Sequence, residues 1–166
     1  KGRKVAFLTR HGKGHSVPPH MINYQANIMA LKKLGVQQII ATAAVGSLNE
    51  KMKPLEFVLC DQFLDFTKMR KTTYFEGGGT GVVHLDVTDP YCARTRSFIE
   101  KQAKSLGLPI HNGGCYVCTE GPRFETPAEI RMFKQLGGDL AGMTSVPEVL
   151  LAREAGMCYA TICMVT

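Results

Sequence analysis

The stretch DLAGMTSVPEVLLAREAGMCYATICMVT, residues 139–166, carries the clearest fold signal in the sequence. It reads as a short apolar strand at 139–144, a helix over 146–156 that ends at a glycine, and a second strand at 158–166. Strand–helix–strand alternation at this spacing is typical of a mainly parallel sheet with helices on both faces. This segment therefore predicts an α/β fold.

The same alternation continues towards the N-terminus. Helical patterns cover 23–35, 91–107 and 127–137, and a glycine-rich loop occupies 75–81. Strand-like apolar runs lie at 5–11, 37–47, 55–66 and 113–121. We predict a single α/β domain over residues 1–166, with a mainly parallel central sheet flanked by helices and ligands gathered at strand ends.

Composition limits the classes of partner. The net charge of +6 comes partly from basic runs at 32–35 and 68–71, but neither alternates with aromatic residues, so we interpret them as solvated surface rather than a nucleic-acid face. No apolar run reaches the roughly 18 residues that cross a bilayer, and no leader sequence is recognisable, which predicts a cytoplasmic protein. The chain begins and ends within strand-like runs, so we expect it to be incomplete at both termini.

The six cysteines are interpreted as ordinary buried thiols in a reducing compartment. Cys115 and Cys118 form a CxxC spacing, which can indicate redox chemistry or half of a zinc site. Here the pair lies in a strand-like apolar run, and no second close pair accompanies it. No metal is predicted.

Two glutamates are explained by helix starts. Thr126 and Glu129 have the spacing of a capping box, in which each side chain bonds the backbone N–H of the other residue. Ser145 and Glu148 repeat that spacing at the next helix. We therefore predict capping roles for Glu129 and Glu148, and we interpret Glu120 as a loop carboxylate.

Glu125 has no helix-capping role, and Phe124 lies beside it in a turn. An acid next to a flat ring suits a planar heterocycle, because the ring can stack while the carboxylate accepts an N–H. The alternative is a hydrophobic plug beside a solvated acid. The residues alone leave both interpretations open.

Polar groups at three strand ends suit an anion. Arg10 and His11 end the first predicted strand and can hold a phosphate through charge-assisted hydrogen bonds. The small residues at 42–47 offer free amides, and Met143 and Thr144 directly precede a helix N-terminus. If these three ends converge, they form one phosphate site.

Taken together, the motifs RHG (10–12), NYQAN (23–27), TAAVGSL (42–48), GPRFETPAEIRMFKQLGGD (121–139) and GMTSVPEVLLAREAG (142–156) closely resemble the trimeric purine nucleoside phosphorylase and methylthioadenosine phosphorylase family. The resemblance runs through nearly the whole chain in the right order. It implies phosphorolysis of a purine nucleoside to the free base and a ribose 1-phosphate. It also implies a homotrimer with no cofactor, in which inorganic phosphate is a co-substrate.

The resemblance also assigns residues. It implies that phosphate is bound by Arg10 and His11, which are the catalytic pair, by Thr144, and by the backbone of Ala43 and Ala44. Some methylthioadenosine enzymes have threonine where Ala43 stands, so a side-chain contact would be lost there. By the same resemblance, Phe124 flanks the base and Met143 lies against the sugar.

Two positions bear on the substrate. A glutamate at the place of Glu125 accepts the N1–H of 6-oxopurines in the family, whereas methylthioadenosine enzymes tend to have serine there. His84 matches a histidine of the methylthio enzymes that reaches the 5′ end of the nucleoside from a neighbouring subunit. The mixture implies 5′-methylthio nucleosides, with tolerance or preference for a 6-oxopurine. The alternatives are a general phosphorylase of inosine and guanosine and a non-catalytic nucleoside-binding domain.

The resemblance places two further parts of the site outside residues 1–166. A glycine-rich phosphate loop would precede Lys1, and an Asn or Asp that recognises the base would follow Thr166. Asn there would favour a 6-oxopurine and Asp a 6-aminopurine.

Overall fold

The computed structural model describes residues 2 and 4–166 of the chain. Within them, four α-helices flank a single sheet of seven strands. The helices are α1 (Tyr24–Lys33), α2 (Ala93–Ser105), α3 (Pro127–Gln135) and α4 (Ser145–Glu154), with short 3-10 turns η1 (Pro19–Met21) and η2 (Gly78–Thr80). The strands are β1 (Gln38–Ser47), β2 (Phe57–Leu59), β3 (Gln62–Phe66), β4 (Ile110–Asn112), β5 (Cys115–Thr119), β6 (Leu140–Gly142) and β7 (Cys158–Val165).

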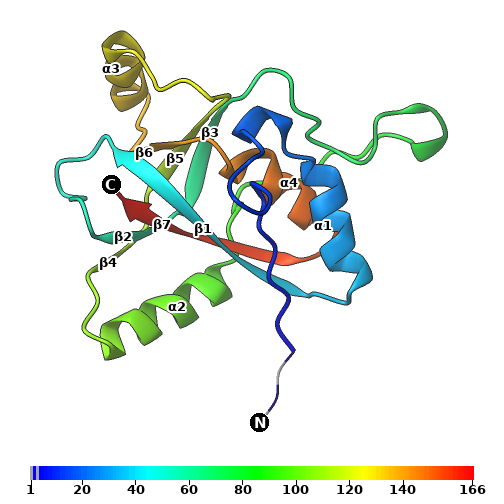
Figure 1. Ribbon diagram of the computed structural model, residues 1–166, viewed down its shortest axis with the longest axis horizontal. Helices are drawn as coiled ribbons and strands as arrows, with labels where there is room; N and C mark the ends of the chain where they lie inside the picture. The colour runs from blue at the N-terminus through cyan, green and yellow to red at the C-terminus, as the bar shows by residue number, and fades with distance from the viewer. Residues whose placement is uncertain (1, 3) are drawn as a thin grey trace.

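The sheet has the strand order β3-β5-β6-β1-β7-β2-β4, and it is mainly parallel as predicted (Figure 1). Four of the six strand pairs in the described chain are parallel, and the exceptions are β1 with β6 and β2 with β7. The longest pairing joins β1 to β7, in register from Gln38 opposite Cys158 to Val45 opposite Val165. Neighbouring parallel strands need a crossover, which α3 supplies between β5 and β6.

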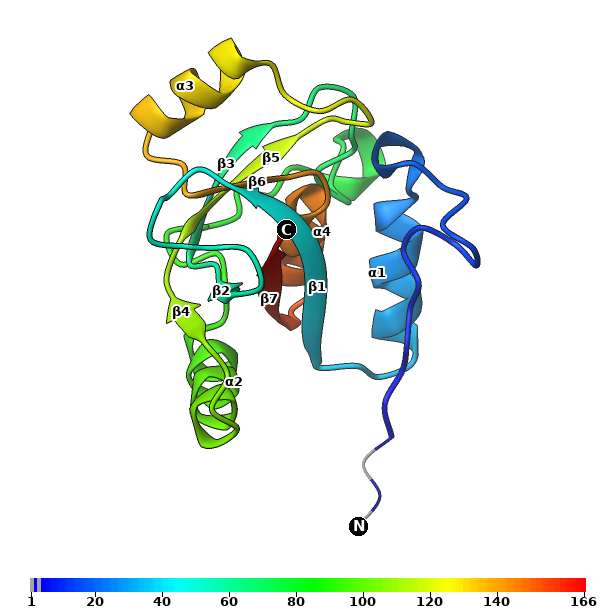
Figure 2. The same cartoon turned by 60° about the vertical axis from the view of Figure 1, so that its left-hand side comes forward.

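Helices cover both faces of the sheet, because side chains alternate along each strand. The main core buries Ile28 of α1 and Val149 of α4 against one face, where Tyr159 and Cys163 of β7 point. The opposite face packs α2 through Ile99 at one end, and α3 packs through Phe133 at the other. Figure 2 shows α1 and α4 on one side of the β1–β7 pair and α2 on the other. None of the helices in the described chain is long and apolar enough to cross a membrane.

The predicted strand at 5–11 is wrong. In the structure, residues 4–9 form no strand, and the Phe7 side chain is 94% exposed. An apolar run becomes a strand only where a neighbour satisfies its backbone hydrogen bonds, and no strand among the described residues pairs with this one. Conversely, β4 was missed because Ile110 is the only apolar residue among its three, so no apolar run marks it.

The expectation of free buried thiols is wrong for two of the six cysteines. A disulfide joins Cys92 to Cys158, because the N-terminus of α2 lies against the start of β7, where the Cys92 N–H donates to the Tyr159 carbonyl at 2.8 Å. The expectation is confirmed for Cys60, Cys118 and Cys163, which are free and buried, while Cys115 is free and half-buried.

The CxxC pair does not have the properties of a reactive site. Burial raises the pKa of the Cys118 thiol to about 12 and that of Cys115 to about 11, so both thiols stay protonated. Among the described residues, no group of three or more His, Cys, Asp or Glu side chains is placed to hold a metal ion.

Candidate active site

Arg10 lies where three segments of the chain meet. It stands in the turn that precedes η1, and its guanidinium reaches both the central sheet and the start of α4. Nη1 donates to the Thr42 carbonyl of β1 at 2.8 Å. Nε and Nη2 donate to the two carboxylate oxygens of Glu148 at 3.1 and 2.6 Å. Arg10 therefore contacts β1 and α4, but it does not end a strand and Thr42 lies within β1, so the convergence of three strand ends on a phosphate stays a prediction.

Glu148 does not form the predicted capping box with Ser145. Val146 between them has extended backbone angles (φ −111°, ψ 131°), so the first turn of α4 is not helical and the reciprocal geometry cannot form. Instead, the Glu148 side chain is 6% exposed and pairs with Arg10, and it accepts a hydrogen bond from the Tyr159 hydroxyl at 2.6 Å. The prediction for Glu129 is confirmed, because its capping box with Thr126 is complete.

The ion pair keeps Arg10 charged. Burial by itself lowers the pKa of Arg10, but the Glu148 carboxylate outweighs it through charge and hydrogen bonding, so the pKa is raised above the ordinary value. A guanidinium carries five N–H groups, and three of them have the acceptors named above. Within the described chain two N–H groups remain, on a side chain that is 15% exposed. Arg10 can therefore donate two further hydrogen bonds to an anion without breaking an existing one.

His11 lies beside Arg10 with one ring nitrogen already bonded. Nδ1 is 2.9 Å from the Val17 carbonyl, and the ring stacks on His15 with centroids 4.3 Å apart. Because a carbonyl can only accept, Nδ1 carries the proton in this contact. Nε2 is thus an acceptor when the ring is neutral and a donor only when the ring is cationic.

The other predicted phosphate residues lie on β1 and directly before α4. Ala43 and Ala44 follow Thr42 on β1, Ala43 half-buried and Ala44 exposed. Thr144 is buried directly before α4, and its backbone N–H donates to the Tyr116 hydroxyl at 3.2 Å. The arrangement places Arg10, Ala43 and Thr144 on three neighbouring segments.

Phe124 and Glu125 do not form a hydrophobic plug beside a solvated acid, which was one of the two interpretations that the sequence left open. The Phe124 ring is 85% exposed, so it plugs no core. Glu125 is half-buried, and its Oε1 accepts a hydrogen bond from the buried Thr119 hydroxyl at 2.6 Å. Oε2 has no partner in the part of the chain that is described, and it can therefore accept an N–H from a ligand.

Met143 lies against the loop that follows β5. Gly121 has φ +67°, and a Cβ built on it would lie 2.7 Å from the Met143 sulfur. Glycine at this position therefore lets the loop after β5 lie directly against Met143.

His84 is not joined to these residues. It is exposed in the segment between η2 and α2, which runs back to the domain from the projecting loop that carries η2 in Figure 1. In the described chain no hydrogen bond links it to any other predicted site residue.

Three functional candidates were missed by the sequence reasoning: Glu148, Tyr159 and Arg70. Arg70 lies in the basic run 68–71 that was interpreted as solvated surface, yet its side chain is only 2% exposed. It borders a cavity of about 480 Å³ lined by residues 20–25 and 69–71, which includes none of the predicted phosphate residues. No local signal separates a buried arginine from exposed ones in such a run.

Known proteins with similar sequences and structures agree on one family. The sequence pattern of the phosphorylase superfamily matches residues 1–166. The chain is 59% identical over 165 residues to a protein of Moorella thermoacetica named as a probable 6-oxopurine nucleoside phosphorylase, covering 99% of this chain and 64% of the relative. It is 57% identical over 165 residues to a probable S-methyl-5′-thioinosine phosphorylase of Methanothermobacter thermautotrophicus, covering 99% and 56% respectively.

The structural comparison agrees. Methylthioadenosine phosphorylase from Schistosoma mansoni, solved in its apo form, superposes with a TM-score of 0.92 at 40% identity, over 96% of this chain and 63% of that one. The chain thus spans less than two thirds of the length of the relatives named here. The pattern over residues 1–166, the high identities and the shared fold together place the chain in the phosphorylase superfamily.

Proposed function

We propose that the full-length protein cleaves the N-glycosidic bond of purine nucleosides with inorganic phosphate, releasing the base and a pentose 1-phosphate. Its preferred substrates are 5′-methylthio nucleosides, methylthioadenosine or methylthioinosine. No cofactor takes part, since phosphate itself is the attacking co-substrate.

The position of Arg10 carries this proposal. Its guanidinium is fixed between β1 and α4 and keeps two N–H groups for an anion. In phosphorolysis the sugar passes through a cation-like transition state. A phosphate held beside it by Arg10 and His11 stabilises the positive charge and then attacks the sugar carbon. The bond to the base breaks, and its electron pair leaves with the purine.

Glu125 bears on the base. Its Oε1 is held by Thr119, which leaves Oε2 to accept the N1–H of a 6-oxopurine such as hypoxanthine. Adenine has no proton at N1 and cannot make that bond. This arrangement favours methylthioinosine over methylthioadenosine, and the exposed Phe124 ring provides a flat surface for the base.

A second candidate is a general 6-oxopurine nucleoside phosphorylase that uses inosine and guanosine. Glu125 suits both candidates, and the names of the Moorella and Methanothermobacter relatives divide between them. The 5′ substituent separates the two. We propose a homotrimer in which the exposed His84 of one subunit reaches the 5′ end of the nucleoside bound by its neighbour, which would favour the methylthio candidate. We further propose that the protein is a cytoplasmic enzyme of purine and methionine salvage.

The test is an assay of the full-length protein for base release, with and without phosphate. Methylthioinosine, methylthioadenosine, inosine and adenosine are compared at equal concentrations. We expect phosphate-dependent release that is fastest with methylthioinosine. Faster turnover of inosine would favour the second candidate, and no phosphate-dependent release from any nucleoside would leave a non-catalytic binding domain.

A further inference from the structure

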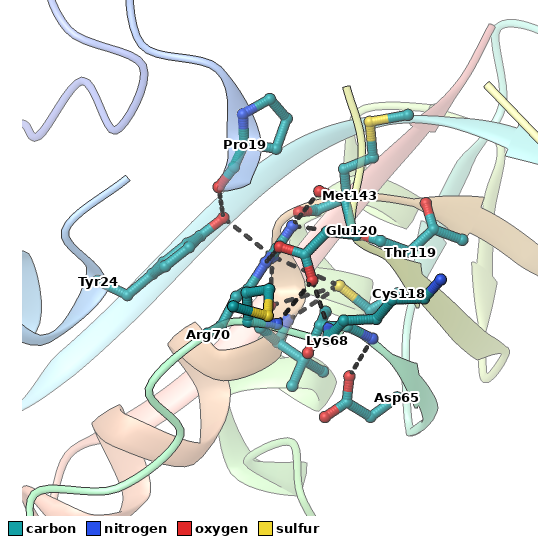
Figure 3. Close-up of polar contacts among 12 residues, drawn as sticks. Pro19, Tyr24, Asp65, Lys68, Arg70, Cys118, Thr119, Glu120 and Met143 are labelled. Atoms are coloured by element: carbon teal, nitrogen blue, oxygen red, sulfur yellow. Dashed lines mark hydrogen bonds and ion pairs between the residues drawn. The ribbon is translucent and has the colours of Figure 1, made fainter. Parts of the chain in front are cut away.

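Arg70 is the most heavily bonded side chain in the described structure, and it lies at the centre of Figure 3. Nη1 donates to the carbonyls of Met143 and Val146 at 2.8 and 2.7 Å. Nη2 donates to the carbonyls of Thr119 and Glu120 at 3.2 and 2.7 Å. Nε faces Glu120 Oε1 at 3.3 Å. All five N–H groups therefore have acceptors, and none is left for a ligand.

The four carbonyls belong to two different segments. Thr119 and Glu120 end β5 and lead into the loop that carries Phe124 and Glu125. Met143 and Val146 flank Thr144, between β6 and the helical part of α4. One guanidinium thus joins the loop after β5 to the turn before α4, although the bonded carbonyls of Glu120 and Met143 lie 50 and 73 positions along the chain from Arg70. A planar cation with a fixed fork sets the spacing between the segments that it joins.

Arg70 is itself held in place. The Glu120 carboxylate bonds the Nε–H of Arg70 and also accepts from the backbone N–H groups of Lys68 and Met69, which closes the turn around the arginine. Burial alone would raise the pKa of Glu120, but these donors outweigh burial and lower it, so the carboxylate stays ionised. On the other side, the guanidinium carbon is 5.3 Å from the centre of the Tyr24 ring, and Nη1 is 3.1 Å from the Tyr24 hydroxyl.

We propose that Arg70 is a positioning residue that sets the geometry between base recognition and phosphate binding. It touches neither ligand. It acts through Thr119, which bonds Glu125, and through Met143, which adjoins Thr144. The inference about catalysis rests on the proposed function, whereas the inference about geometry rests on the contacts alone.

The test uses the full-length protein with Arg70→Lys, which keeps the charge but loses the planar fork. The matched control is Arg96→Lys on α2, where a guanidinium of 15% exposure donates to Asn112 on the other side of the sheet. Amide hydrogen exchange is followed in the segments 119–125 and 143–146. In Arg70→Lys we expect both segments to exchange about tenfold faster together, with α2 unchanged, since losing shared hydrogen bonds favours local opening. In Arg96→Lys these two segments keep wild-type exchange.

Unchanged exchange in a folded Arg70→Lys protein overturns the proposal, as does a change confined to one segment. If Arg70→Lys does not fold, Glu120→Gln replaces it. That variant removes the carboxylate charge that pairs with Arg70 Nε and accepts from the N–H groups of Lys68 and Met69. It should raise amide exchange in 119–125 and 143–146 by a smaller factor. Wild-type exchange in both segments of Glu120→Gln would equally overturn the proposal.

A kinetic measurement separates positioning from mere stability. In Arg70→Lys we expect KM for phosphate and KM for nucleoside both to rise about tenfold at temperatures where the protein stays folded. Arg96→Lys should leave both within twofold. If the wild-type protein shows no phosphorolysis, the proposed function fails, while hydrogen exchange still decides whether Arg70 couples the two segments.

Discussion

Arg10 and Arg70 are the two arginines bonded most extensively within the candidate region, and they use their N–H groups differently. Arg10 pairs with Glu148 and with the Thr42 carbonyl and keeps two N–H groups, whereas Arg70 uses all five on the protein. Arg10 is also the more exposed, 15% against 2%. We infer that the number of N–H donors left after the protein's own hydrogen bonds distinguishes the arginine proposed to bind phosphate from the one proposed to position the site.

The largest expected effect comes from removing the guanidinium of Arg10. Arg10→Met leaves the buried Glu148 carboxylate without its counter-charge, and we expect a loss of about 3–5 kcal/mol in the free energy of unfolding. Urea unfolding measures it. Adding Glu148→Gln, which removes the charge but keeps an acceptor for Tyr159, should restore much of the loss. A single variant within about 1 kcal/mol of wild type would show that the two side chains do not form a buried pair.

A second test concerns the loop that Arg70 holds. Glu125→Ala removes the acceptor for the purine N1–H. We expect inosine-type nucleosides to lose about 1–3 kcal/mol more transition-state stabilisation, calculated from kcat/KM, than adenosine-type ones. The ratio of the two kcat/KM values is the measurement. Equal losses for both classes would remove the role given to Glu125.

Thr119 should give a smaller effect in the same direction. Thr119→Val keeps the shape but loses the hydroxyl that bonds Glu125, so the preference for 6-oxopurines should decline by about 0.5–1.5 kcal/mol. Thr119→Ser retains a hydroxyl and serves as the control. If valine and serine behave alike, the Thr119–Glu125 bond does not contribute to base choice.

The smallest expected effect concerns the exposed ion pair of Arg123 and Glu129, which contrasts with the Arg10–Glu148 pair. Arg123 donates to both oxygens of Glu129 at 2.8 and 2.7 Å, and this bonding, with the Thr126 N–H, lowers the pKa of Glu129 to about 2. A depressed carboxyl pKa stabilises the fold above the unfolded value of about 4.3, and that contribution disappears as the pH falls towards 2. Thermal unfolding across pH 5 to 2 should therefore depend slightly less on pH in Glu129→Gln. An unchanged slope would show that the exposed pair contributes nothing.

Much of the fold was predictable from local pattern. The helices α1 to α4 and the strands β1, β5, β6 and β7 lie within two or three residues of their predicted places, because each has an apolar run and a recognisable start or stop. The predicted strand at 5–11 failed because strand formation depends on a partner elsewhere in the chain. The Cys92–Cys158 disulfide joins residues 66 positions apart, and only the folded topology brings them together.

The candidate site was predictable only in part. The resemblance assigned Arg10, Ala43 and Thr144 to one phosphate site, and the structure bonds Arg10 to Thr42 of β1 and to Glu148 of α4, while their binding of phosphate stays a prediction. Glu148 was misassigned because its spacing from Ser145 matches a capping box, whereas the extended Val146 prevents one. Arg70 was not found, since four of its acceptors are backbone carbonyls, which leave no trace in the sequence.

The most direct test of the account is initial-rate kinetics of the full-length wild type, Arg10→Lys and Arg70→Lys, with phosphate and nucleoside varied independently. We predict that Arg10→Lys raises KM for phosphate about tenfold or more and leaves KM for nucleoside within about twofold, because it removes donors to one ligand only. Arg70→Lys should raise both. If Arg10→Lys leaves KM for phosphate unchanged, or if the two variants give the same pattern, the distinction between a ligand-binding and a positioning arginine is wrong.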